Sequence, residues 1–177
     1  EGKCVLVTGA SGYLASNLTK SLQNISCTLR RLTRKPDLPV LNGKAIVEYI
    51  QGEITEASVW RQAMQGVDIV FHFAGQTSVY VADEDPDIDY RVNVLPMLHM
   101  LETCKNIEGQ PDIIFAGTST QVGLPENLPV DEMFQDKPIT IYDLHKWMAE
   151  NYLKCYARMG VVRGVTLRLT NVYGPGP

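Results

Sequence analysis

The sequence contains no long apolar run, no excess of basic charge and no closely spaced pair of cysteines. A membrane-spanning helix needs about 20 consecutive apolar residues, so the first absence argues against a transmembrane protein. Lysine and arginine together number 16 against 20 aspartates and glutamates, which gives a net charge of −4. A chain without a basic surplus is not expected to bind nucleic acid or an anionic membrane surface.

The four cysteines lie far apart in the sequence, and none belongs to a C-x-x-C pair. Zinc knuckles and redox pairs use such spacing, so neither a metal site nor a redox site is predicted. Cys4 and Cys27 stand in apolar runs, where the simplest interpretation is a small buried thiol. Unpaired cysteines fit a reducing cytoplasm, which is the expected location.

The composition that is present is that of an ordinary globular domain, with 45% hydrophobic and 20% charged residues in a chain of 177. Short apolar runs alternate with helix-like stretches, and several runs lack the alternation of a half-exposed strand. This order predicts a single α/β domain over residues 1–177, a Rossmann-type doubly wound parallel sheet with helices on both faces. The predicted strands are 3–8, 27–32, 45–50, 69–74, 113–117 and 165–169, and the predicted helices are 14–22, 57–64, 94–105 and 141–159.

The first predicted strand runs into a glycine-containing loop, Thr8-Gly9-Ala10-Ser11-Gly12-Tyr13-Leu14-Ala15. A strand, a few small residues and a helix start form the geometry that binds a dinucleotide. Gly9 permits the tight turn, and Gly12 lets the backbone approach a pyrophosphate at the helix N-terminus. The simpler alternative is an ordinary glycine-rich turn. The loop resembles the T-G-x-x-G-x-x-G pattern of the short-chain dehydrogenase/reductase superfamily, with Ala15 in place of the last glycine, and the resemblance implies cofactor contacts from Gly9, Ser11, Gly12, Tyr13 and Leu14.

The end of the second predicted strand carries cations where NAD-binding proteins usually carry a carboxylate. Four arginines and lysines fall within residues 30–35, and a guanidinium suits a ribose 2′-phosphate by charge and by fork geometry. Arg30 and Arg34 therefore favour NADP over NAD, with a solvated basic loop as the alternative. Farther on, Gly52-Glu53-Ile54 resembles the superfamily's G-D-[IL], which implies that Glu53 and Ile54 contact the adenine end of the cofactor.

Tyr142 and Lys146 form a Y-x-x-x-K motif within a predicted helix, where residues four apart share one face. A phenol has an ordinary pKa near 10. A neighbouring ammonium, with an oxidised nicotinamide beside it, favours the phenolate and is expected to move the pKa of Tyr142 towards neutrality. Tyr142 could then exchange a proton with a substrate hydroxyl while hydride moves, and Lys146 could hold the nicotinamide ribose. The alternative is a tyrosine that merely packs on a helix face.

A third polar residue follows the fifth predicted strand, in Phe115-Ala116-Gly117-Thr118-Ser119-Thr120-Gln121-Val122-Gly123. This segment resembles the superfamily's strand that ends in Ser/Thr before V-Y-G. Counted back from Gly123, Thr118 falls at the catalytic Ser/Thr position, where its hydroxyl could hydrogen-bond the substrate oxygen that gains charge. Ser119, which the resemblance places beside the substrate, takes that role if the register slips by one residue.

Three further segments resemble the extended branch of the superfamily, the NAD-dependent epimerase/dehydratase family. They are Asp68–Gly75, the Asp85-Pro86…Asn93-Val94 pair, and Leu167–Gly176 with its N-V-Y-G-P-G ending. His145 replaces the serine that commonly precedes the lysine, and His72 is interpreted as structural because it lies inside an apolar strand. The resemblance implies cofactor contacts from Phe73, Ala74, Gly75, Asn93 and Val172, as well as from Thr118, Tyr142 and Lys146, and substrate contacts from Thr77, Ser119 and Asn171.

The resemblance implies hydride transfer with NADP or NAD on a nucleotide sugar, carried out by a homodimer packed through helices near Leu98 and Trp147. Epimerisation or reduction is favoured over dehydration, because Ser119-Thr120 stands where dehydratases carry an Asp-Glu pair. Two alternatives stay open: an NADPH-dependent reductase of a non-sugar carbonyl, and a non-catalytic dinucleotide-binding protein. In the family the chain continues beyond N-V-Y-G-P-G into a C-terminal substrate lobe. We therefore expect that lobe to be absent here, with Pro177 a truncation point.

Overall fold

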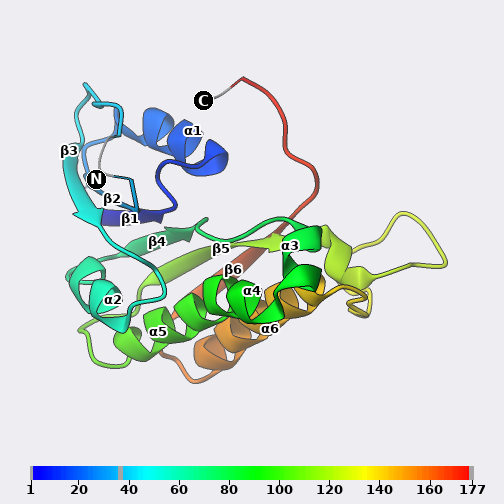
Figure 1. Cartoon of the computed structure of the whole chain (residues 1–177). Helices are drawn as coiled ribbons and strands as arrows, with labels where there is room; N and C mark the ends of the chain where they lie inside the picture. The colour runs from blue at the N-terminus through cyan, green and yellow to red at the C-terminus, as the bar shows by residue number, and fades with distance from the viewer. Residues whose placement is uncertain (1, 36–37, 176–177) are drawn as a thin grey trace.

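A computed structural model describes residues 2–35 and 38–175 and contains a six-stranded parallel sheet (Figure 1). The strand order is β3-β2-β1-β4-β5-β6, the Rossmann arrangement. In chain order the strands are β1 (Cys4–Thr8), β2 (Thr28–Thr33), β3 (Ile46–Gln51), β4 (Ile69–His72), β5 (Asp112–Thr118) and β6 (Arg163–Leu169). The predicted α/β fold is confirmed, and each predicted strand end lies within two residues of the observed one.

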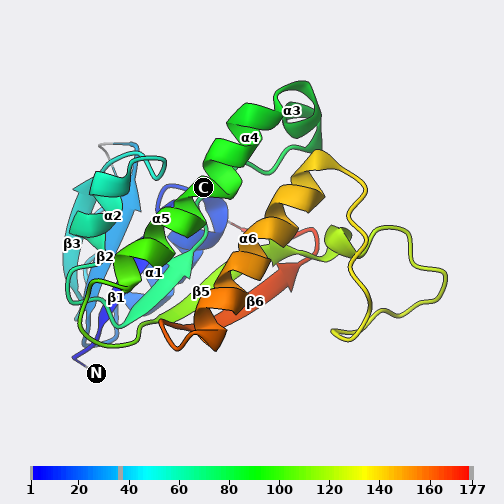
Figure 2. The ribbon, with the colours of Figure 1, turned by 90° about the horizontal axis from the view of Figure 1, so that it is seen from below.

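Helices cover both faces of the sheet. Helix α1 (Tyr13–Leu22) lies on one face, and α2 (Ala57–Ala63), α5 (Leu95–Cys104) and α6 (Ile141–Arg158) lie on the other (Figures 1 and 2). Figure 2 shows α3 (Val79–Glu84) and α4 (Pro86–Asn93) continuing beside the N-terminal end of α6. A short 3-10 helix, η1 (Ser119–Val122), follows β5 directly. None of the helices in residues 2–35 and 38–175 is long and apolar enough to cross a membrane.

Two apolar layers hold the helices to the sheet. On the α1 face, Ala15 and Leu18 pack against Val5, Val7 and Leu29. The larger layer lies on the opposite face, where the strand residues that point away from α1 pack against the other helices. It includes Leu6, Trp60, Val70, Met97, Met100, Leu101, Phe115 and Leu153. Strands β1 and β4 are therefore apolar on both faces, which explains why their sequences show no alternation.

Helix α5 begins at Leu95 and places Pro96 in its first turn. A backbone N–H in the first turn has no partner within the helix, so the proline removes no helical hydrogen bond. Pro96 is therefore compatible with a helix that begins at Leu95. Among the predicted buried thiols, Cys27 is buried and Cys4 is half-buried. Leu98 and Trp147 are half-buried in the single chain, and the homodimer stays a prediction.

The order of the strands in the sheet changes direction at the neighbouring strands β1 and β4. Strands β1, β2 and β3 proceed one way and β4, β5 and β6 the other, so the loops after β1 and β4 diverge at the middle of the sheet. Ligands of open parallel sheets bind outside the carboxyl ends of the strands at such a switch point. The topology thus brings the segments after Thr8, Thr33, Gln51, His72, Thr118 and Leu169 to one edge.

His72 is buried in the core at the end of β4. Its Nδ1 lies 2.9 Å from Thr8 Oγ1, and its ring lies between Trp60 and Phe115, with centroids 5.4 and 5.8 Å away. Burial, together with the smaller effect of the Lys146 charge, lowers the pKa of His72 to about 3. The interpretation of His72 as a structural residue agrees with these contacts.

The buried imidazole predicts a loss of stability in acid. Because the folded-state pKa lies below the unfolded value of about 6.5, the unfolded chain binds the extra proton between these limits. Stability from His72 is complete above pH ~6.5 and is lost as the pH falls towards ~3, with a slope of about 1.4 kcal/mol per pH unit. Urea unfolding of the wild type and His72→Asn from pH 7 to 4 checks this. Equal slopes for the two proteins would show that His72 is not held neutral.

Candidate cofactor and active site

Two adjoining cavities lie along the carboxyl edge of the sheet. The first, which we call the glycine-loop cavity, is lined by Gly9, Ser11, Gly12, Leu32, Thr33, Arg34, Gly52, Glu53, Ile54, Phe73, Ala74, Gly75 and Val92. The second, the tyrosine cavity, is lined by Tyr13, Leu14, Phe73, Gly75, Gln76, Thr77, Val79, Ala116, Gly117, Thr118, Ser119, Thr120, Tyr142, Lys146, Leu169, Thr170, Asn171 and Val172, and has a volume of about 650 Å³. Phe73 and Gly75 line both cavities, so the two form one continuous depression.

Gly9 is required where the chain leaves β1. Its φ is +66°, and an added Cβ would lie 2.9 Å from the Cα and the amide nitrogen of Ala74. The loop after β1 therefore contacts the backbone of the loop after β4 directly. Gly12 caps α1 without a side-chain hydrogen bond, so the first amides of that ten-residue helix have no side-chain partner there. The predicted residues Gly9, Ser11 and Gly12 come together at this point, while Tyr13 and Leu14 face the tyrosine cavity.

Thr8 fixes the two loops to each other, a role that the sequence did not reveal. Its Oγ1 accepts hydrogen bonds from the amides of Phe73 at 3.1 Å and Ala74 at 3.0 Å. The same hydroxyl is bonded to His72. The backbone of Phe73, Ala74 and Gly75 is thereby held against the glycine loop, where the motif resemblance had placed these three residues.

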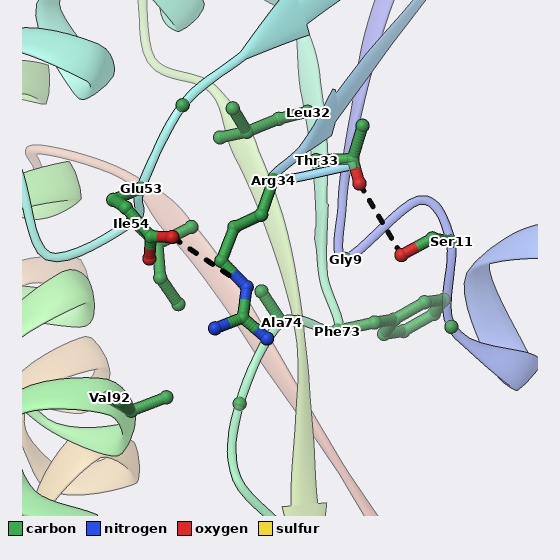
Figure 3. A pocket seen from close by; sticks show the side chains of 13 residues that line it. Gly9, Ser11, Leu32, Thr33, Arg34, Glu53, Ile54, Phe73, Ala74 and Val92 are labelled. Carbon is green, nitrogen blue, oxygen red and sulfur yellow. Dashed lines mark hydrogen bonds and ion pairs between the residues drawn. The ribbon is translucent and has the colours of Figure 1, made fainter. Parts of the chain in front are cut away.

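Arg34 and Glu53 meet in the glycine-loop cavity, as Figure 3 shows. Arg34 Nε lies 3.8 Å from Glu53 Oε1, and both side chains keep more than half of their surface exposed. Across the cavity, Thr33 Oγ1 donates to Ser11 Oγ at 3.4 Å. An exposed pair at this distance is held weakly, so the guanidinium is free to rearrange around a bound group.

Arg30, predicted as a cofactor residue, does not line the cavity. Its Nε donates to Glu48 at 2.8 Å, and its Nη1 donates to the carbonyls of Ala63 and Gln65, each at 2.7 Å. Arg34 lies four residue steps farther along the chain, a distance of about 13 Å in extended backbone. At the place of Arg30 the C-terminal carbonyls of α2 attract a cation.

Arg31 is also turned away from the cavity. Its Nη1 donates to the carbonyl of Pro39 at 2.8 Å, and its guanidinium lies 5.3 Å from the centre of the Tyr49 ring. Two of the four cations that favoured NADP are therefore engaged elsewhere. Of the other two, Arg34 lines the glycine-loop cavity and Lys35 does not.

Helix α6 and strand β5 carry the predicted catalytic residues into the tyrosine cavity. Thr140 caps α6 by accepting the amide of Asp143 at 3.1 Å, and Tyr142 and Lys146 follow on one face of the first turns. Thr118 ends β5 opposite them. Thr118, Tyr142 and Lys146 line the cavity together with Thr77, Ser119, Asn171 and Val172, so these predicted residues share one site.

The electrostatics of Tyr142 differ from the expectation. Burial, together with the smaller effect of the negative charges of Asp143 and Asp89, raises its pKa to about 12. The predicted shift of this pKa towards neutrality is therefore not a property of the chain by itself, because burial and two nearby carboxylates all raise it. Lys146 is buried with its Nζ 4.3 Å from the centre of the Phe115 ring, and this burial lowers its pKa to about 8.

A chain of hydroxyls orients Thr118. Its Oγ1 lies 2.7 Å from that of Thr120, which donates to Asp143 Oδ1. The other oxygen of Asp143 accepts from Thr140 Oγ1 at 2.7 Å. Sequence reasoning missed Thr120 and Asp143, although an acid in the first turn of a capped helix was a readable signal for Asp143. The relay links the end of β5 to the start of α6.

Arg168 of β6 forms ion pairs with α6 and with the loop that precedes it. Arg168 of β6 donates to both oxygens of Asp136, each at 2.8 Å, and to Glu150 of α6 at 2.7 and 3.1 Å. Glu150 is buried and also accepts from Gln121 at 3.1 Å. Charge-assisted bidentate pairs are among the stronger polar contacts, so the helix that carries Tyr142 is held in a fixed place.

Asn93 is the one other predicted cofactor residue that does not line a cavity. Its Nδ2 donates to the carbonyl of Gln76 at 3.1 Å and to Asp89 at 2.8 Å. An added Cβ at Gly75 would lie 2.8 Å from Asn93 Oδ1, so Asn93 supports the backbone of the loop after β4. The structure thus places Asn93, predicted as a cofactor residue, behind the loop after β4 and not in the wall of either cavity.

Residues 5–177 match the model of the NAD dependent epimerase/dehydratase family. A putative UDP-glucose 4-epimerase of Methanocaldococcus jannaschii is 30% identical over 174 residues, covering 96% of this chain and 56% of that protein. A D-erythronate dehydrogenase of Cupriavidus necator is 31% identical over 181 residues, covering 95% of this chain and 55% of that protein. The solved structure of MoeE5 in complex with UDP-glucose and NAD has a TM-score of 0.88 at 26% identity, covering 98% of this chain and 56% of that one. The chain thus spans about half the length of these relatives.

Proposed function

Because the chain belongs to the NAD dependent epimerase/dehydratase family, we propose that it contributes the cofactor site and the catalytic hydroxyls of an enzyme that transfers hydride at a carbinol or carbonyl carbon of a nucleotide sugar. One observation carries this proposal: Thr118, Tyr142 and Lys146 line a cavity that is continuous with the glycine-loop cavity. UDP-glucose and NAD occupy the solved structure of the relative MoeE5. Epimerisation or reduction is favoured over dehydration, because Ser119 and Thr120 follow Thr118.

The residues present fit a nicotinamide dinucleotide. A Cβ at Gly9 would fill the place where the backbones of the two loops meet, and the N-terminal amides of α1 are open to an anion. Gly9, Ser11 and Gly12 would hold the pyrophosphate, Glu53 and Ile54 the adenine end, and Lys146 and Val172 the nicotinamide end. When bound, the dinucleotide supplies the hydride acceptor or donor and, in its oxidised form, a positive charge.

The proton chemistry falls to the chain's own residues. With a pKa of about 12, Tyr142 is protonated at neutral pH and can donate a proton from Oη to a substrate carbonyl. In the opposite direction the substrate O–H bond breaks and its proton passes to the Tyr142 phenolate. Lys146, with a pKa of about 8, is cationic at neutral pH and favours that phenolate. Thr118 hydrogen-bonds the substrate oxygen that gains charge.

A product survey tests the proposal. The whole protein is incubated with NAD and one of UDP-glucose, UDP-glucuronate or UDP-N-acetylglucosamine, and in separate samples with NADPH and a UDP-linked 4-keto sugar. The sugars are followed by NMR. An epimer formed without net cofactor consumption identifies an epimerase, whereas consumption of NADPH with a keto sugar identifies a reductase. If no nucleotide sugar is converted in any combination, the proposal fails.

A non-sugar substrate is the second candidate function. It is favoured by the relative described as D-erythronate dehydrogenase, which is as similar in sequence as the epimerase. Hydroxy acids and simple ketones in the same assay discriminate between the two. The third interpretation, a non-catalytic dinucleotide-binding protein, loses support because Thr118, Tyr142 and Lys146 lie in one cavity.

For the cofactor we propose that Arg34 decides whether a ribose 2′-phosphate is accepted. Arg34→Ala should weaken NADPH binding about tenfold, the effect of losing one charged hydrogen bond, and should leave NADH binding within about twofold. Fluorescence titration with both nucleotides measures this, and Arg61→Ala, an exposed arginine outside the cavity, is the matched control. Wild-type protein that binds NADH as tightly as NADPH would show that no 2′-phosphate is recognised, in keeping with the NAD-bound relative.

A further inference from the structure

Asp89 of α4 is a fully buried carboxylate that the proposed reaction does not use. Its Oδ1 accepts from Gln76 Nε2 at 2.7 Å and from Asn93 Nδ2 at 2.8 Å. Its Oδ2 lies 2.7 Å from His145 Nδ1. Gln76 belongs to the loop after β4 and His145 to α6, so one side chain joins three segments of the site.

The partners of Asp89 define its chemical state. The amide nitrogens of Gln76 and Asn93 can only donate, and they meet an oxygen that accepts twice. With His145 donating from Nδ1, both oxygens act as acceptors, which is the pattern of a carboxylate without its proton. The His145 ring is in addition packed edge-on against Tyr90, with centroids 5.7 Å apart, so its position is fixed.

His145 stands between the two residues on which the proposed chemistry depends. It directly precedes Lys146, and it lies three residues after Tyr142 on the same helix. A displacement of His145 would therefore move both side chains. Gln76, on the other side of the network, lines the tyrosine cavity, so the network also sets the cavity wall opposite α6.

The buried ammonium of Lys146 needs a negative charge nearby. The titratable groups that belong to the surrounding elements and act on it or share its cavity are His72 at the end of β4, Asp89 of α4, and Tyr142 one turn earlier on α6. In the part of the chain that the structure describes, no carboxylate comes within 4.0 Å of Lys146 Nζ to form an ion pair. Asp89 is bonded at 2.7 Å to His145, the residue that directly precedes Lys146 on α6, and its charge opposes the effect of burial on the pKa of Lys146.

We propose that Asp89, fixed by His145, Gln76 and Asn93, is a positioning residue that supplies the counter-charge of Lys146 and sets the first turns of α6 against the loop after β4. The inference rests on the proposed function for the role of Lys146. Asp89 also raises the pKa of Tyr142, which by itself disfavours the phenolate. Asp89 also keeps Lys146 charged, and a charged Lys146 favours the phenolate. Because these two effects of Asp89 on Tyr142 oppose each other, the turnover rate alone would not separate them.

The test therefore reads Lys146 directly. In protein labelled with ¹³C at the lysine ε-carbons, with the Lys146 signal assigned from Lys146→Met, Asp89→Asn should lower the pKa of Lys146 by about half a unit or more. Asp87→Asn, which removes an exposed carboxylate on the same helix, should leave that pKa unchanged. Equal pKa values in the two variants would overturn the proposal.

A measurement on the wild-type protein decides the matter if Asp89→Asn does not fold. The sequence has three histidines, so ¹⁵N spectra of labelled protein can be assigned with His145→Gln. We expect His145 to carry its proton on Nδ1, and an unprotonated Nδ1 would overturn the proposal. Neither readout needs cofactor or turnover, so a protein that converts no sugar but passes both tests contradicts only the proposed function.

Discussion

Replacing Tyr142 by phenylalanine should lower turnover about a thousandfold, within the range for loss of a general acid or base, and leave the affinity for NAD within about twofold. The variant removes one oxygen, the atom proposed to exchange the substrate proton. The ring remains in a cavity wall that is fixed by the Thr140 cap and the Asp143 relay. Rates with the best nucleotide sugar and a fluorescence titration with NAD measure the two quantities.

Tyr152→Phe is the matched control, because Tyr152 lies on α6 but outside both cavities. We expect that variant to retain wild-type turnover. If Tyr142→Phe kept more than about a tenth of the activity, another group would have to move the proton, and the role of Tyr142 would be wrong.

Replacing Gly9 by alanine should reduce NAD affinity about a hundredfold or more and destabilise the fold. The new Cβ would lie 2.9 Å from backbone atoms of Ala74, which cannot turn aside as a side chain could. Left-handed backbone costs a non-glycine residue about 1–2 kcal/mol, and forcing the two loops apart adds about 1–3 kcal/mol of overpacking. The displaced loops are those that would hold the pyrophosphate.

Gly66→Ala supplies the control for the backbone term. Gly66 has a φ of +65°, almost the same as that of Gly9, but nothing lies within 4 Å of an added Cβ. Urea unfolding should show the smaller loss for Gly66→Ala, and NAD titration should show no loss. Equal effects of the two substitutions on stability and affinity would mean that the close approach to Ala74 has no importance.

The sheet could be predicted because its strands are short apolar runs separated by helix-like stretches. Helices α3 and α4 were missed, since the segment from Val79 to Asn93 has no long apolar periodicity. Each nevertheless begins at a side-chain cap. Ser78 accepts the amide of Val81 at 3.4 Å, and Asp85, followed by Pro86, accepts that of Ile88 at 3.0 Å. Such caps are signals that sequence reasoning can use.

The site was predictable where a residue follows the end of a strand. Parallel strands end at one edge, so Gly9, Glu53, Gly75, Thr118 and Val172 had to lie along it once the strands were placed. Long side chains were less predictable. Arg30 and Arg34 occur in the same basic run, but only packing shows that the end of α2 takes the first and leaves the second in the cavity.

Burial and long-range pairing could not be predicted from one sequence. The Tyr-Lys spacing indicated a lowered pKa for Tyr142, whereas desolvation by the surrounding elements raises it. The contact between Asp89 and His145 joins residues 56 positions apart, and no local pattern announces it. Both features arise from how α4 and α6 pack together.

The central claim is that this cavity positions a nucleotide sugar for hydride transfer beside Tyr142. Its most direct test is a single turnover of the whole protein, loaded with NAD, with UDP-glucose, UDP-glucuronate or UDP-N-acetylglucosamine deuterated at the reacting carbon. We expect deuterium to appear on the nicotinamide of the quenched wild-type sample and to be absent with Tyr142→Phe. Protein that binds NAD but takes deuterium from none of these sugars would contradict the account.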